Sequence, residues 1–160
     1  MSGKKVVATN RKARHFYNIT DTYEAGIVLE GLEVKSLREG QADLQDSFAR
    51  PEPVVVQGSA KRWEIFLYNM HIAPYSFARA AGYESRRKRK LLLHRNEIRR
   101  LVGKVLEKNF MLIPLEVYFK KGKAKICLGV GKGKKLYYHR EELRQRAIKV
   151  EVKREISNNF

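Results

Sequence analysis

The sequence has little of what marks secreted, membrane-spanning or disulfide-linked proteins. Its single cysteine, Cys127, cannot form an internal disulfide, so a reducing cytosol is the simplest compartment. No segment approaches the roughly 20 apolar residues that a spanning helix needs, and the N-terminus lacks the apolar stretch of a signal peptide. We therefore expect a cytoplasmic protein.

Signatures of catalysis are missing as well. The four histidines, at positions 15, 71, 94 and 139, are scattered, and none has metal-ligand spacing. The stretch GVGKGKK, residues 129–135, lacks the spacing of a phosphate-binding loop, and no Ser/His/Asp or paired-carboxylate pattern is visible. The sequence therefore predicts no catalytic residue, no metal and no cofactor.

Negative charge is also scarce, because 34 Lys and Arg face only 17 Asp and Glu, which gives a formal net charge of +17. The basic residues are spread over the whole length of the chain. This balance favours a polyanionic partner, most often nucleic acid, with an anionic membrane as the main alternative. The length of 160 residues allows one domain with its own core and a tail.

Alternating apolar residues predict several short strands. Period-two segments occur at residues 23–30, 43–50 and 62–72. The clearest hairpin alternates over residues 111–119, turns at KKGK (120–123) and alternates back over 124–130. Pro114 within its first strand predicts an edge or a bulge.

Helical spacing marks two segments. Residues 32–37, followed by Gly40, predict a short helix. Apolar residues over 98–105 predict a longer helix, with Glu97 near its start and Asn109 at its end.

Three other segments are less regular. PEPVVVQGSA, residues 51–60, combines prolines with valines and suggests an irregular hairpin. Residues 1–14 are polar and basic, and we expect a flexible arm there. Residues 137–160 carry mixed charge and only a sparse apolar stripe (Ile148, Val152 and Ile156), which predicts a tail that is disordered alone and helical when bound.

Together these elements predict a mainly β fold. Five to seven short strands fit a small antiparallel barrel of the oligonucleotide-binding kind, because closure removes exposed strand edges. We expect this barrel to occupy residues 15–136, with one to three flanking α-helices and a flexible basic C-terminal tail.

The basic run at residues 86–90 stands directly before the leucines at 91–93. Adjacent positive charges repel one another, so folding alone gives little reason to place them beside core residues. An ordered contact with phosphate gives such a reason, and a solvated loop is the alternative. Five tyrosines lie among basic residues, where each either packs in the fold or stacks on an unpaired base: Tyr23, Tyr75, Tyr83, Tyr137 and Tyr138.

Five blocks of the sequence match one known family in order and spacing. They are NRKARHFY (10–17), YEAGIVLEGLEVKSLREG (23–40), NMHIAPY (69–75), RRKRKLLLHRNEI (86–98) and GKGKKLY (131–137). With them, nearly the whole chain resembles SmpB, the SsrA-binding protein family.

The resemblance implies a bacterial ribosome-rescue factor that is not an enzyme. Members of the family bind transfer-messenger RNA and carry it, together with elongation factor Tu, to ribosomes stalled on messages without a stop codon. Their barrel binds the tRNA-like domain around its elbow and stands in for the missing anticodon arm. Their tail enters the decoding centre and the empty message channel. We expect a monomer with these partners and no membrane partner.

The resemblance also implies functional residues. Asn10, Glu24 of the E-A-G motif and Leu92 of K-L-L-L match positions linked to RNA binding. The residues expected to bind RNA are Asn10, Arg14, His15, Tyr23, Glu24, Glu33, Lys35, Arg38, Arg86, Arg87, Lys88, Arg89, Lys90, Leu91, Leu92 and His94. The residues expected to bind the ribosome are Gly133, Lys134, Lys135, Tyr137, His139 and Arg140.

Two departures from the family pattern stand out. The family usually continues G-K-K-x-x-D-K-R, whereas here Tyr138 replaces the acid and His139 the lysine, which puts engagement of the ribosome by the tail in question. Residues 51–62 are longer and more apolar than the short turn usual there.

Two other classes of function remain as alternatives to a rescue factor. A nuclease or RNA-modifying enzyme would need convergent acids or a metal site. A generic single-strand-binding barrel would bind oligonucleotides with little regard to RNA fold.

Overall fold

The structure is a computed structural model that describes residues 3–58, 61–75 and 82–134. The predicted tail, residues 137–160, lies outside the described residues. Within them, no helix is long and apolar enough to cross a membrane.

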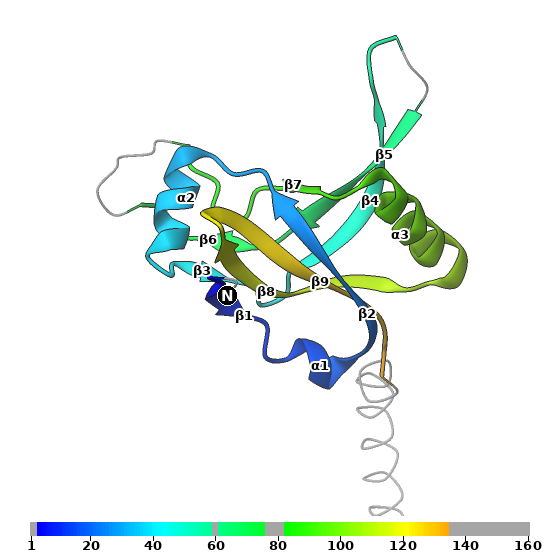
Figure 1. Cartoon of the computed structure of the whole chain (residues 1–160), viewed down its shortest axis with the longest axis horizontal. Coiled ribbons are helices and arrows are strands. Elements are labelled where there is room, and N and C mark those ends of the chain that lie inside the picture. Colours follow the sequence, from blue (N-terminus) through cyan, green and yellow to red (C-terminus); the bar gives the residue numbers. More distant parts are fainter. Residues whose placement is uncertain (1–2, 59–60, 76–81, 135–160) are drawn as a thin grey trace, which may run out of the picture.

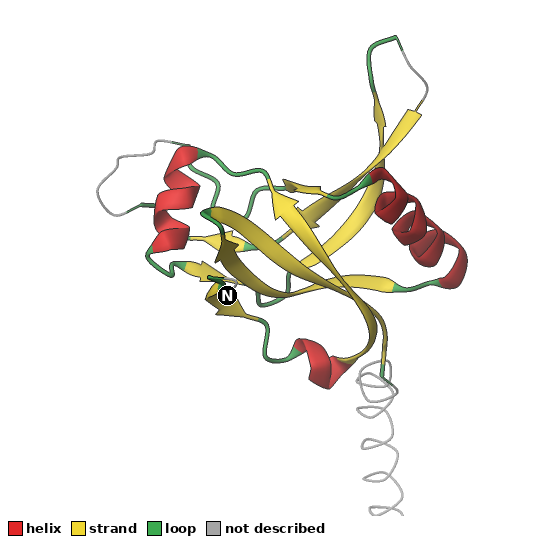
Figure 2. Ribbon diagram, in the orientation of Figure 1, coloured by secondary structure: helices red, strands yellow, loops and turns green. Residues whose placement is uncertain are grey.

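Six antiparallel strands close into a barrel (Figures 1 and 2). In their order around the ring they are β8 (Met111–Lys120), β4 (Phe48–Val55), β5 (Lys61–Tyr68), β7 (Arg89–Leu92), β2 (Tyr17–Ile27) and β9 (Lys123–Gly133), which pairs again with β8. Two very short strands, β3 (Ala42–Asp43) and β6 (His71–Ile72), pair with each other separately. The predicted mainly β barrel is confirmed.

The first strand, β1 (Lys5–Thr9), corrects the prediction of a flexible arm. It pairs with β8, from Lys5 opposite Phe119 to Thr9 opposite Glu116. This edge of β8 is open because β4 meets β8 only where Ala49 faces Leu112, and an unpaired edge exposes unsatisfied backbone groups. A short helix, α1 (Ala13–Phe16), then leads into β2.

The predicted β8–β9 hairpin is confirmed. Lys121 and Gly122 form its turn, with φ of 51° and 75°; such left-handed pairs suit the twist of two-residue hairpins. Pro114 lies at a bulge, since the register shifts between Pro114 and Glu116. The bulge breaks the expected alternation: Ile113 and Leu115 pack with Ala13 in a small cluster separate from the main core.

The β4–β5 hairpin is more regular than predicted. Pro51 pairs with Ile65 and Pro53 with Trp63 inside one continuous ladder. Prolines fit there because β4 leaves β8 after Ala49, so its other edge needs no N–H donor. The strand predicted at residues 43–50 is instead two strands, β3 and β4, separated by a turn in which Asp46 has a φ of 62°.

Both predicted helices are present, each with a carboxylate at its start. In α2 (Gly31–Arg38), Glu33 accepts a hydrogen bond from the Glu30 N–H at 2.8 Å. In α3 (Arg95–Lys108), Glu97 accepts one from the His94 N–H at 3.0 Å. These contacts satisfy donors that a helix leaves free at its N-terminus. Asn109 ends α3 in the left-handed conformation.

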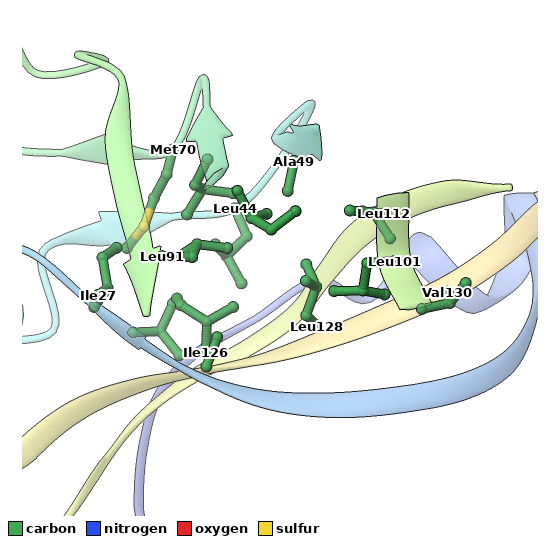
Figure 3. Close-up of a cluster of buried hydrophobic side chains, with 14 of the residues drawn as sticks. Ile27, Leu44, Ala49, Met70, Leu91, Leu101, Leu112, Ile126, Leu128 and Val130 are labelled. Atoms are coloured by element: carbon green, nitrogen blue, oxygen red, sulfur yellow. The ribbon is translucent and has the colours of Figure 1, made fainter. Parts of the chain in front are cut away.

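The core fills the barrel (Figure 3), and Ile98 and Leu101 of α3 belong to it. Leu91, Ile126 and Leu128 from β7 and β9 are fully buried. Leu101 of α3 is buried beside them and points toward the same space as Leu112 of β8. Because α3 packs against β4 and β5, it holds these strands in place at the side where β7 passes into the helix.

Candidate nucleic-acid interface

The basic run at residues 86–90 contains both a buried residue and residues that face solvent. Arg89 and Leu91 on β7 point into the core, where each is fully buried, because successive strand residues face opposite sides. Lys88 and Lys90 therefore face outward, on the same side as Leu92. Two of the residues predicted to contact RNA, Arg89 and Leu91, are therefore buried in the core.

Arg89 is held by acceptors from three parts of the chain. Its Nε donates to Glu33 Oε2 at 2.7 Å, its Nη1 to the Met70 carbonyl at 2.6 Å and its Nη2 to the Ser85 carbonyl at 3.1 Å. A buried cation is tolerated only when paired and hydrogen-bonded in this way. Arg86, which is exposed, donates to the Asn69 carbonyl at 3.0 Å.

Glu33 is the shared acceptor of this cluster. It is fully buried, and Arg87 donates to both of its oxygens, at 3.1 Å from Nε to Oε2. Burial alone would raise the pKa of the Glu33 carboxyl, but hydrogen bonds from Arg87, the Glu30 N–H and Arg89 outweigh burial and lower it. Glu33, for which an RNA contact is predicted, thus ties α2 to β7, and its side chain has no exposed surface in this structure.

Lys88 and Lys90 are the cations that remain accessible on the outer face of β7. Lys88 Nζ lies 3.0 Å from Glu52 Oε2 and 4.4 Å from the centre of the Phe66 ring, and Lys90 Nζ lies 3.8 Å from Glu64. Both lysine side chains are exposed, at 48% for Lys88 and 43% for Lys90, although their carboxylate partners are largely covered, and an ion pair with one such solvated partner contributes little free energy. Both ammonium groups can therefore exchange a carboxylate for a phosphate at small cost.

A groove of about 610 Å³ lies where β2, β7 and the β8–β9 turn meet. It brings together three of the predicted RNA-binding residues, Glu24, Leu92 and His94. Lys123 and Lys125 of β9 line the same groove. Since Lys88 and Lys90 lie on the face of β7 that ends at Leu92, the strand carries a line of positive charge toward it.

The E-A-G motif builds the floor of this groove. Glu24 faces outward, Ala25 is fully buried in the core, and Gly26 pairs with Leu92 across the β2–β7 ladder. A Cβ on Gly26 would lie 3.2 Å from the Leu92 Cβ, so the glycine lets Leu92 lie close against β2. Leu92 remains 51% exposed and offers an apolar surface between charged side chains.

Glu24 is positioned by two partners on β8. The Tyr118 hydroxyl donates to Glu24 Oε2 at 2.5 Å, and Lys120 Nζ lies 3.4 Å from the same oxygen. The hydrogen bond from Tyr118 is the largest cause that lowers the pKa of Glu24, and Lys120 adds to it. The carboxylate is thus ionised and oriented, while its side chain stays 41% exposed.

Three other predicted RNA-binding residues lie on elements near the groove, two on α2 and one on β2. The Arg38 guanidinium lies 4.9 Å from the ring centre of Phe119, which lines the groove. Lys35 Nζ lies 5.6 Å from the Tyr75 ring. Tyr23, on β2 beside Glu24, has Lys104 Nζ at 5.8 Å from its ring.

A second group of predicted residues lies at the opposite end of β2. Arg14 and His15 are exposed on α1. Gly133 pairs with Tyr17, and the Lys134 N–H donates to the Phe16 carbonyl at 2.9 Å. The structure thus places part of the predicted ribosome-binding set beside α1. The rest of that set, Lys135, Tyr137, His139 and Arg140, lies outside the described residues.

Asn10 has a structural contact at the β8 bulge. Its Nδ2 donates to the Pro114 carbonyl at 3.0 Å, and its N–H donates to the Leu115 carbonyl at 2.7 Å. These bonds use acceptors that the bulge takes out of the ladder. In this conformation the Asn10 side chain fixes the junction between β1 and α1.

Sequence reasoning missed Tyr118, Lys120, Lys123 and Lys125. The sequence predicts only a strand at Tyr118, only a turn at Lys120 and Lys123, and only the returning strand at Lys125. The alternation of apolar and polar residues shows which side chains of a strand face outward. It does not show which other strand pairs with that strand, and so it could not place these residues beside Glu24. Among the described residues, no group of three or more His, Cys, Asp or Glu could hold a metal ion.

Comparisons with known proteins agree with the sequence resemblance. The family model described as SmpB protein matches residues 7–158. The chain is 50% identical to the SsrA-binding protein of Acetivibrio thermocellus, with 98% of this chain and 96% of that one covered, and 52% identical to that of Pelotomaculum thermopropionicum, with 98% and 96% covered. A solved chain described as "tmRNA-SmpB: a journey to the center of the bacterial ribosome" is 50% identical, with a TM-score of 0.63 over 88% of this chain and 92% of that one.

Proposed function

Because the chain belongs to the SmpB family, we propose that it binds transfer-messenger RNA and acts with it on bacterial ribosomes in trans-translation. The observation that carries this function is the groove that joins Glu24 and Leu92, beside a line of exposed lysines. An apolar surface, an oriented carboxylate and nearby cations suit a folded RNA with unpaired bases.

The two ends of β2 have different functions, one in binding the RNA and the other also in contacting the ribosome. The groove end, with Lys88, Lys90, Arg38 and His94, binds the tRNA-like domain of the RNA. The α1 end carries Arg14 and His15, which bind RNA, next to Gly133 and Lys134. Gly133 and Lys134 face the ribosome together with residues 137–160, which occupy the decoding centre and the empty message channel. Phosphate contacts at both ends set position, and contacts with bases and shape set specificity.

The protein acts by binding and not by catalysis, in the cytoplasm, as a monomer. Elongation factor Tu joins it on the charged RNA in the delivery complex. The barrel supplies a rigid surface in place of an anticodon arm, and rigidity favours recognition of shape over simple attraction to phosphate.

Competition binding at matched salt tests this function. We expect transfer-messenger RNA to displace a labelled tRNA-like domain at far lower concentration than unstructured RNA of equal length. The same RNA should copurify with the protein from bacterial cells. Equal competition by unstructured RNA would indicate a generic single-strand-binding barrel.

A further inference from the structure

Glu24 is an acid in a strongly basic surface, and RNA phosphates repel it. Lys120 balances its charge at 3.4 Å, and Lys123 and Lys125 line the same groove. A nucleotide that enters this groove is therefore oriented by charge: its phosphate turns to the lysines and its base turns to the carboxylate. The inference rests on the proposed function, because it concerns the RNA contacts of that groove.

The β2–β7 register sets the distance between Glu24 and the apolar surface. Gly26 lies opposite Leu92, and Glu24 lies two residues before Gly26 on the same face of β2. Diagonal neighbours of this kind lie about 7–8 Å apart, with their β-carbons somewhat closer. A base that lies flat on Leu92 and Gly26 therefore reaches the Glu24 carboxylate with one edge.

The hydrogen bonds already made by Glu24 limit which edge it can accept. A carboxylate offers about four acceptor positions, and two are taken at Oε2 by Tyr118 and Lys120. Within the described part of the chain, Oε1 accepts none. The carboxylate can thus accept two further donors and can donate none, because its lowered pKa keeps it ionised.

Among the four bases, guanine offers two adjacent donors, N1–H and the N2 amino group. Adenine and cytosine each place a ring acceptor beside their amino group, and uracil has its N3–H between two carbonyls. An ionised carboxylate repels those neighbouring acceptors. We propose that Glu24 selects an unpaired guanine of the bound RNA, which lies on Leu92 and Gly26 and donates N1–H and N2–H to Oε1 of Glu24, the oxygen that Tyr118 and Lys120 leave free.

Inosine substitution tests the contact atom by atom, since inosine lacks only the N2 amino group. Each unpaired guanine of the tRNA-like domain is replaced in turn by inosine, and binding is measured to the wild-type chain and to Glu24→Gln. Losing one hydrogen bond to a charged acceptor costs about tenfold in affinity. We expect one inosine position to weaken wild-type binding about tenfold and to leave Glu24→Gln binding unchanged.

Two matched controls separate this effect from general damage. Replacing the same guanine by 7-deazaguanine alters the opposite edge of the base and should not affect binding. Glu116→Gln removes another strand carboxylate, which pairs with Lys4 outside the groove, and should keep the tenfold response to inosine. Thermal unfolding of both variants verifies that they fold.

The result that would overturn the inference is an inosine effect of equal size in the wild-type chain and in Glu24→Gln, or no effect at any position. If the wild-type chain still prefers transfer-messenger RNA to unstructured RNA, the proposed function stands while the guanine contact fails. Loss of that preference would instead refute the proposed function itself.

Discussion

Replacing Glu33 by glutamine should destabilise the whole domain although the side chain keeps its shape. Glu33 receives Arg89 Nε at 2.7 Å and Arg87 Nε at 3.1 Å. In Glu33→Gln, Arg89 becomes a fully buried cation with only carbonyl partners. Breaking a buried ion pair from one side costs about 3–5 kcal/mol, a large part of the roughly 5–15 kcal/mol that stabilises a domain.

Urea unfolding followed by circular dichroism measures this loss. The midpoint should fall while the slope of free energy against urea stays the same, because the exposed surface on unfolding does not change. Glu39→Gln, at the exposed C-cap of the same helix, is the matched control and should change stability by less than about 0.5 kcal/mol.

The pH dependence provides an independent measurement. The folded pKa of Glu33 lies below its ordinary value of 4.5, so its contribution is fully present above pH 4.5 and is lost as the pH falls through the folded pKa. Wild-type stability should therefore drop in this acidic range more steeply than that of Glu33→Gln. A destabilisation below about 1 kcal/mol at neutral pH would refute the role of Glu33 as the anchor of the arginines.

Three further results are expected. Replacing Lys88 and Lys90 by alanine should flatten the dependence of log affinity on log salt by roughly 0.7–0.9 for each lost phosphate contact, with the fold intact, and an unchanged slope would show that neither lysine binds phosphate. Gly26→Ala should weaken RNA binding, because the new methyl group would lie 3.2 Å from the Leu92 Cβ and displace Leu92; unaltered affinity would show that Leu92 and Gly26 do not form a surface on which a base lies. Deleting residues 138–160 should leave binding to transfer-messenger RNA nearly intact and abolish tagging in a reconstituted translation assay; joint loss of both would show that these residues belong to the RNA-binding body.

Local patterns predicted the local parts of the fold. The β8–β9 hairpin and α3 depend on neighbours in sequence, so alternation, helical spacing, Glu97 and Asn109 were enough to predict them. The β1 strand depends on an edge of β8 that is open only because β4 leaves it at Ala49. No pattern within residues 5–9 reports that edge, and the prediction of a flexible arm failed for this reason.

The basic run illustrates a different limit. Its composition is uniform, so residues that face the core and residues that face solvent look alike in the sequence. Arg89 is distinguished by its buried acceptors, of which Glu33 lies 56 residues away in the sequence. Glu24 and Leu92 were identified through the family resemblance, and their meeting in one groove depends on the β2–β7 register, which sequence reasoning did not reach.

The pairing of β1 with β8 affects how the protein folds while it is being synthesised. The Lys4–Glu116 ion pair at this junction joins residues 112 positions apart. The pairing of β2 with β9 likewise cannot form until β9 has been translated. At about 5–20 residues per second, a ribosome needs roughly 5–20 seconds to make the partner of the first strand. During that interval the strand is unpaired, and the charges of Lys4 and Lys5 disfavour its pairing with strands of other nascent chains. The barrel therefore closes late, when nearly the whole domain has been translated.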